Sequence, residues 1–188
     1  MKEKYFIGYL LPNHAALQAE EIATDLSKTF LLRNVYKKYP PHITLKTPFF
    51  ATPLQAADLL DFTMTNFLVG RKSITSAVEL SGFGHFNIGT IYWDLIDEHD
   101  SITTIQRELC DAFENNVEWM QFEKFEPNGI PHVTVATGDI RGRFKNIYEY
   151  LKKKYPEPIQ IVLDTICLFK KNQNGVWEIV LAQTLTSK

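Results

Sequence analysis

The chain carries one short pattern twice, and this repeat constrains its fold more than any other feature. Pro41–Leu45 and Pro131–Val135 both have the order Pro-His-aliphatic-Thr-aliphatic, and their histidines lie 90 residues apart in a chain of 188. The same order of expected elements surrounds each copy: strand, helix, proline break, histidine-bearing strand, helix and strand. We therefore predict one domain, residues 1–188, with approximate internal two-fold symmetry.

Hydrophobic periodicity and turn residues give the expected elements. We predict strands at 5–11, 42–49, 74–86, 90–96 and 132–136, and helices at 15–30, 53–70, 101–113 and 144–155. A closing hairpin is expected from strands 159–170 and 176–184 around the turn at 172–175. No linker rich in Gly, Ser or charge separates the halves. The first lobe is therefore predicted at roughly 5–86 and the second at roughly 90–188, with exchange of strands between lobes left open.

Composition excludes several classes of protein. Twenty Lys and Arg against 22 Asp and Glu give a formal charge of −2, which argues against a large basic surface for nucleic acid but permits a local basic site. The two cysteines, Cys110 and Cys167, form no CxxC pair. The first residues lack the apolar core of a signal peptide, and no run of 18 apolar residues suggests a membrane span. We expect a cytoplasmic protein without a membrane partner.

The repeated pattern places two polar side chains on one face of each strand. Residues i and i+2 of a strand share a face, so His42 projects with Thr44, and His132 with Thr134. Two imidazoles on either side of a phosphate suit general acid–base catalysis, because histidine titrates nearest to neutral pH. The threonine hydroxyls can donate hydrogen bonds to non-bridging phosphate oxygens.

The same residues leave other functions open. A duplicated structural hairpin would also repeat a pattern, although it would preserve core residues best, whereas here the agreement includes the polar His and Thr. A non-catalytic RNA- or nucleotide-binding module is the main alternative to an enzyme, and a metal-binding protein is a third. No carboxylate or cysteine lies at either motif, so we predict neither metal nor cofactor.

With these motifs, the chain resembles the 2H phosphoesterase superfamily and, within it, the 2′-5′ RNA ligase-like proteins. The resemblance extends to the opening strand Phe6–Pro12 and the closing strand Cys167–Lys170. It implies an α+β, bilobal fold, in which two pseudo-symmetric lobes, each an antiparallel sheet with outer helices, surround a central cleft. It also implies metal-independent cleavage or formation of phosphodiesters at RNA ends, 2′,3′-cyclic phosphates or 2′-5′ linkages. The implied partner is an RNA end or a small nucleotide phosphodiester.

Carried over by motif, the resemblance implies acid and base roles for His42 and His132 and phosphate contacts for Thr44 and Thr134, without saying which histidine is the acid. Many relatives follow the second motif with a small residue and then Arg. This chain instead has Ala136-Thr137-Gly138, a departure that concerns RNA-end specificity and not the phosphoesterase chemistry.

Four further residues are candidates for substrate binding. Strict alternation would put Lys46 on the face of His42 and Thr44, where it would bind phosphate; a solvated edge lysine is the alternative. Arg141 follows the second motif strand and is a candidate for RNA phosphates, or else solvates a helix start. By family position, Phe6 and Phe169 are candidates for stacking on a base.

Overall fold

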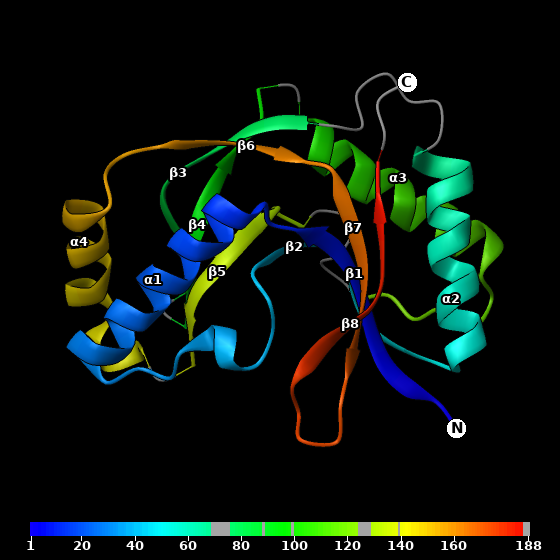
Figure 1. Cartoon of the computed structure of the whole chain (residues 1–188), viewed down its shortest axis with the longest axis horizontal. Coiled ribbons are helices and arrows are strands. Elements are labelled where there is room, and N and C mark those ends of the chain that lie inside the picture. The colour runs from blue at the N-terminus through cyan, green and yellow to red at the C-terminus, as the bar shows by residue number, and fades with distance from the viewer. Residues whose placement is uncertain (69–75, 88, 99, 124–128, 139, 186–188) are drawn as a thin grey trace.

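The computed structural model describes residues 1–68, 76–87, 89–98, 100–123, 129–138 and 140–185. Two four-stranded antiparallel sheets form its framework (Figure 1). The first sheet has the strand order β2-β1-β7-β8 and the second the order β5-β4-β3-β6. Within the described residues no helix is long and apolar enough to cross a membrane.

The strands of the first sheet are β1 (Glu3–Leu10), β2 (His42–Ala51), β7 (Thr165–Lys171) and β8 (Trp177–Thr184). Those of the second are β3 (Ser76–Phe86), β4 (Thr90–Ile96), β5 (His132–Thr137) and β6 (Ile159–Leu163). The α-helices are α1 (Asn13–Phe30), α2 (Pro53–Phe62), α3 (Ser101–Asn116) and α4 (Phe144–Lys154). Three short helical turns are η1 (Val35–Lys37), η2 (Thr63–Leu68) and η4 (Arg141–Arg143).

The α+β, two-lobed architecture is confirmed, but the strands divide between lobes differently from the predicted ranges. We placed β3 in the first lobe, whereas it pairs with β4 and β6 of the second sheet. The predicted single strand 159–170 is two strands. β6 belongs to the second sheet and β7 to the first, with Asp164 between them. Each sheet therefore contains strands from both halves of the sequence.

The helices are exchanged in a similar way. α1 follows a strand of the first sheet but packs against β5 of the second, and α3 follows a strand of the second sheet but packs against β2 of the first. Figure 1 shows α1 and α4 on the side of the second sheet, with α2 and α3 on the side of the first. Each motif strand is thus supported by a helix from the other half of the chain.

Local sequence explains where α2 begins. Thr52 accepts a hydrogen bond from the Gln55 amide, the Gln55 side chain accepts one from the Thr52 amide, and Pro53 occupies the first turn. This reciprocal cap satisfies backbone donors that the first turn leaves without helical partners. The predicted end of this helix at 70, and the first residues of the predicted strand 74–86, lie outside the described residues.

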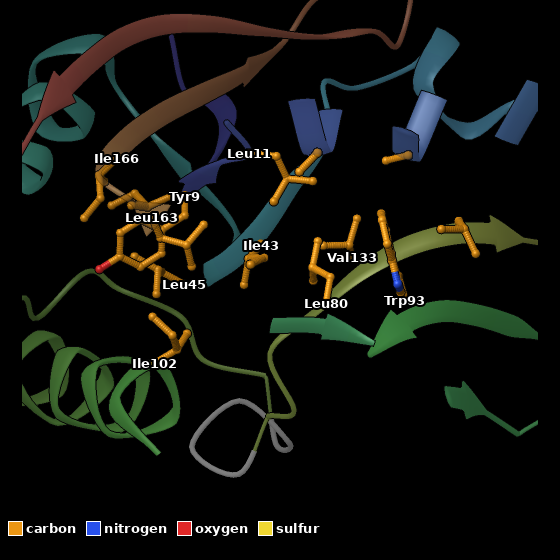
Figure 2. Packing of buried hydrophobic residues seen from close by; sticks show 14 of the residues in the cluster. Tyr9, Leu11, Ile43, Leu45, Leu80, Trp93, Ile102, Val133, Leu163 and Ile166 are labelled. Carbon is orange, nitrogen blue, oxygen red and sulfur yellow. The ribbon is translucent and has the colours of Figure 1, made fainter. Parts of the chain in front are cut away.

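One buried cluster extends through both sheets (Figure 2). The motif strands contribute their alternate aliphatic residues to it, Ile43 and Leu45 from β2 and Val133 and Val135 from β5, all at most 1% exposed. Because neighbours along a strand point to opposite faces, burial of these four turns the histidine and threonine of each motif to the other face. We call that face of each sheet the motif face.

Candidate active site

Each motif histidine is the first residue of an edge strand, and its ring is fixed by the backbone just before it. The Nδ1 atom of His42 lies 2.7 Å from the carbonyl oxygen of Pro40, and that of His132 lies 2.6 Å from the carbonyl oxygen of Ile130. A carbonyl only accepts, so Nδ1 carries the hydrogen in both rings. The neutral ring then presents Nε2 as an acceptor. No hydrogen bond engages either Nε2 within the described part of the chain.

Thr44 and Thr134 are half-buried, and each lies two residues after the histidine of its motif. Their carbonyl groups hold the strands in place. The Thr44 carbonyl accepts a hydrogen bond from Gln106 Nε2 at 3.4 Å, and the Thr134 carbonyl accepts one from the Tyr36 hydroxyl at 2.7 Å. Among the described residues neither threonine hydroxyl has a hydrogen-bond partner, so both remain available to a ligand.

The two histidines lie within electrostatic range of each other, because strands β2 and β5 approach closely. Burial lowers the pKa of His42 to about 4; the Pro40 carbonyl opposes this change and the charge of His132 adds to it. Burial also lowers the pKa of His132, opposed by the Ile130 carbonyl and by the charge of Asp94. Both rings therefore favour the neutral form.

Aromatic rings surround His42 on the first sheet. The centroids of Phe6, Phe169 and Tyr39 lie 4.6, 5.3 and 5.6 Å from that of His42. Phe6 and Phe169 are only 3% and 0% exposed and stack on each other at 4.2 Å, with Trp177 edge-on to Phe6. We predicted that Phe6 and Phe169 stack on a base. Their rings instead contact each other and His42, which leaves no free ring face for a base.

A second aromatic group adjoins His132, and it lies outside the four residues that we predicted to bind substrate. The rings of Phe86 and Tyr92 lie 4.8 and 5.0 Å from His132 and 4.5 Å from each other. Tyr92 extends over Gly84, where a Cβ atom would meet the ring at 2.4 Å. The sequence signal was the alternation Gly84-x-Phe86, which puts a residue without a side chain beside an aromatic on one face.

Lys46 is not on the motif face, because a β-bulge interrupts the alternation. Ile7 pairs with Lys46 while Gly8 pairs with Thr44, so Leu45 and Lys46 together lie opposite Ile7. Lys46 is fully buried; its ammonium donates to the carbonyl of Gln121 at 3.1 Å. The sequence predicted that Lys46 either binds phosphate or is solvated at the strand edge. Its buried position is inconsistent with both predictions. β5 has the same irregularity, since Tyr92 pairs with Thr134 and Ile91 with Ala136.

Arg141 is exposed and lies in η4, beyond the far end of β5 from His132. Thr137 lies five positions after His132 along β5, or about 16 Å at the rise of a β-strand. In the same turn, Arg143 donates a hydrogen bond to the carbonyl of Phe30, the last residue of α1. Among the described contacts none joins Arg141 to His132, so its role in binding RNA phosphates stays a prediction.

The described residues contain no group of three or more His, Cys, Asp or Glu arranged to hold a metal ion. The site instead offers two anchored imidazoles, two unengaged hydroxyls and flanking aromatic rings. Such a set can exchange protons with a substrate and donate hydrogen bonds to an anion.

The chain is similar to several known proteins. The family model described as the 2′-5′ RNA ligase superfamily matches residues 11–175. A Bacillus pumilus protein named "Putative phosphoesterase" is 27% identical over 145 residues, covering 77% of this chain and 78% of that protein. Among solved structures, TT0787 of Thermus thermophilus has a TM-score of 0.63 at 13% identity, with 97% of both chains covered. Escherichia coli LigT has a TM-score of 0.58 at 13% identity, with 99% of both covered, and has also been solved with 3′-AMP.

Proposed function

Because this chain belongs to the 2′-5′ RNA ligase superfamily, we propose that it is a metal-independent phosphodiesterase acting on RNA ends, 2′,3′-cyclic phosphates or 2′-5′ linkages. One observation carries the proposal: both motif histidines are anchored through Nδ1 and leave Nε2 to a substrate, within electrostatic range of each other. The nucleotide bound to E. coli LigT supports a nucleotide substrate, although that likeness is one of fold.

The reaction needs only these side chains. One neutral imidazole accepts, through Nε2, the proton of the attacking water or hydroxyl as its oxygen bonds to phosphorus. The other imidazole, protonated, gives its Nε2 proton to the leaving oxygen as that phosphorus–oxygen bond breaks. Thr44 and Thr134 donate hydrogen bonds to the non-bridging oxygens, whose charge grows in the transition state.

The lowered pKa of both histidines is compatible with this scheme. A bound phosphodiester is an anion, and a nearby negative charge favours the imidazolium form. Substrate binding therefore raises the pKa of the acid histidine at the stage when it must hold a proton. Desolvation of the site strengthens this interaction, because charges attract more strongly at low dielectric.

The test is turnover of 2′,3′-cyclic nucleotides and 2′-5′-linked dinucleotides in the presence of EDTA. Wild-type protein should hydrolyse at least one of them, and His42→Ala or His132→Ala should each lower kcat/KM by roughly 100-fold or more. His14→Ala and His85→Ala are matched controls, since both remove a histidine outside the motifs, and should retain activity. Thermal unfolding of each variant establishes that it is folded.

Three outcomes contradict the proposal. Full activity of either motif variant would remove the two-histidine mechanism. Loss of activity with EDTA would indicate a metal site. Tight binding of these nucleotides without any turnover would instead support the non-catalytic binding module.

A further inference from the structure

The pseudo-symmetry of the two motifs breaks down at their neighbours on the adjacent strand. His42 pairs across the sheet with Leu10, whereas the corresponding partner of His132 is Asp94. Directly opposite residues of an antiparallel pair share a face, with Cβ atoms about 5 Å apart. One imidazole therefore has an aliphatic neighbour and the other a carboxylate.

Aliphatic and aromatic side chains flank the ring of His42. Leu10 packs with the cluster of Phe6, Cys167 and Phe169 on the motif face of the first sheet. In the described part of the chain no carboxylate shifts the pKa of His42, and the charge that acts on it is that of His132, which opposes its protonation. This environment favours a neutral ring.

Asp94 is placed to do the opposite at His132. Its neighbour Trp93 is in the core at 1% exposed, so Asp94 lies on the motif face with His132. One carboxylate oxygen, Oδ1, accepts a hydrogen bond from the Leu95 amide at 3.0 Å, which orients the group. Within the described residues Asp94 has no ion-pair partner, so its charge is not neutralised locally.

Among the residues that the structure describes, the other titratable groups around His132 do not supply a second anion. Tyr92, also from β4, has its pKa raised by burial and by the charge of Asp94, and so keeps its proton. Tyr36, from η1, has its pKa raised by burial and is a hydrogen-bond donor to the neighbouring Thr134 carbonyl. His42, from β2, contributes either no charge or a positive one. Within the described ranges, Asp94 is the anion that distinguishes the two motifs.

We propose that Asp94 is a positioning residue that favours the imidazolium form of His132, so that His132 is the general acid and His42 the general base. This inference rests on the proposed two-histidine function and assigns its two roles. In hydrolysis, His42 Nε2 takes the proton of the attacking water, and His132 Nε2 gives a proton to the leaving oxygen. In the reverse direction, bond formation exchanges the roles, as microscopic reversibility requires.

The decisive variant is Asp94→Asn, which keeps the size of the side chain and an oxygen for the Leu95 amide but removes the charge. Asp58→Asn, on the exposed surface of α2, is the control with the same change in net charge. Asp94→Glu should restore much of the wild-type behaviour, because it restores the carboxylate.

The first readout is titration of the His132 imidazole by NMR, with the resonance assigned through His132→Ala. Asp94→Asn should lower the pKa of His132 by about 0.5 to 1, as loss of a nearby screened charge predicts. Asp58→Asn should leave it at the wild-type value. An unchanged pKa in Asp94→Asn overturns the inference. This readout does not depend on catalysis, so it separates a failure of the Asp94 assignment from a failure of the proposed function.

The second readout is the pH profile of kcat/KM. If His132 is the acid, Asp94→Asn moves the alkaline limb to lower pH and lowers the rate above that limb by roughly 3- to 10-fold, because the protonated fraction falls tenfold for each pKa unit. The rate between the two limbs stays at the wild-type level. A merely structural role would instead lower the rate at every pH, and this outcome overturns the inference.

The plateau also tests the direction of the assignment. If His132 were the base, the active form would have His42 protonated and His132 neutral, and a lower pKa of His132 would make that form more abundant. The rate between the limbs would then rise by roughly 3- to 10-fold in Asp94→Asn. Such a rise overturns the assignment even where the alkaline limb moves, and absence of turnover by the wild type overturns it together with the proposed function.

Discussion

The Tyr36 hydroxyl donates a hydrogen bond of 2.7 Å to the Thr134 carbonyl and thereby joins two segments 98 residues apart. Tyr36 lies in η1, shortly before the first motif, and Thr134 belongs to the second. In the opposite direction, Gln106 of α3 donates to the carbonyl of Thr44 in the first motif. Each motif strand is thus bonded at its threonine to the half of the chain that carries the other motif.

Replacement of Tyr36 by Phe removes this donor and leaves the Thr134 carbonyl without it. We expect the free energy of unfolding to fall by about 1–2 kcal/mol, the cost of a buried hydrogen bond. We also expect kcat to fall by up to roughly 10-fold, because catalysis is sensitive to small displacements of the two histidines. Urea unfolding and steady-state kinetics measure the two effects.

Tyr5→Phe is the matched control for that substitution. Its hydroxyl donates to Glu3, at the far end of β1 from the motif residues. Tyr5→Phe is also expected to lower the free energy of unfolding, but it should leave kcat unchanged. Equal loss of kcat in both variants would show that Tyr36 acts only through general stability.

Gly84 leaves the space that the Tyr92 ring occupies beside His132. An alanine methyl group would lie 2.4 Å from ring atoms of Tyr92, so the ring must move. We expect Gly84→Ala to lower the free energy of unfolding by about 1–3 kcal/mol, as overpacking does, and to lower kcat/KM. Chemical denaturation and kinetics test this prediction.

Gly142→Ala provides the comparison, because nothing lies within 4 Å of a Cβ atom built there. It should be close to wild type in both measurements. Since the clash is with Tyr92, the double variant Gly84→Ala/Tyr92→Ala should lose less stability than the two single losses combined. Strict additivity would mean that the added methyl group acts elsewhere.

The buried ammonium of Lys46 is expected to stabilise the fold rather than bind substrate. It donates to the Gln121 carbonyl and lies 4.9 Å from the centroid of the Phe122 ring, so it ties residues 121–122 to β2. Lys46→Met should lower the free energy of unfolding by about 1–3 kcal/mol because the Gln121 carbonyl loses the donor that the buried ammonium supplies.

The same variant separates structure from phosphate binding. KM for a cyclic nucleotide should change by less than roughly 2-fold in the folded protein, since uniform binding interactions appear in KM. Lys4→Met, a change to a lysine on the neighbouring strand, should leave both quantities near wild type. A large rise of KM in Lys46→Met at unchanged stability would instead place Lys46 at the phosphate.

Strand alternation was enough to predict the motif faces. It separates His42 and Thr44 from Ile43 and Leu45 correctly because one hydrophobic core fixes which face each residue takes. The prediction failed one residue later, at Lys46. A bulge depends on pairing with β1, which the sequence of β2 does not specify by itself.

The pairing of strands was also beyond local sequence. The predicted strand 159–170 contains the change of sheet at Asp164, which depends on contacts of β6 with β3 and of β7 with β1. The environment of each motif histidine likewise depends on which strand pairs with its own. Asp94 and Leu10 acquire their significance only as cross-strand partners of His132 and His42.

The low pKa of His42 predicts how stability depends on pH. Its native pKa of about 4 lies below the ordinary value of 6.5, mainly because of burial. Above pH 6.5 the ring is neutral in both states and contributes no pH dependence. Between pH 6.5 and 4 the unfolded chain binds a proton that the native protein does not, so stability decreases as pH falls, by up to roughly 3 kcal/mol. His42→Ala should lose this component of the slope, whereas Thr44→Val, which removes no titratable group, should retain it. Urea unfolding at a series of pH values measures both, and parallel curves for wild type and His42→Ala would contradict the prediction.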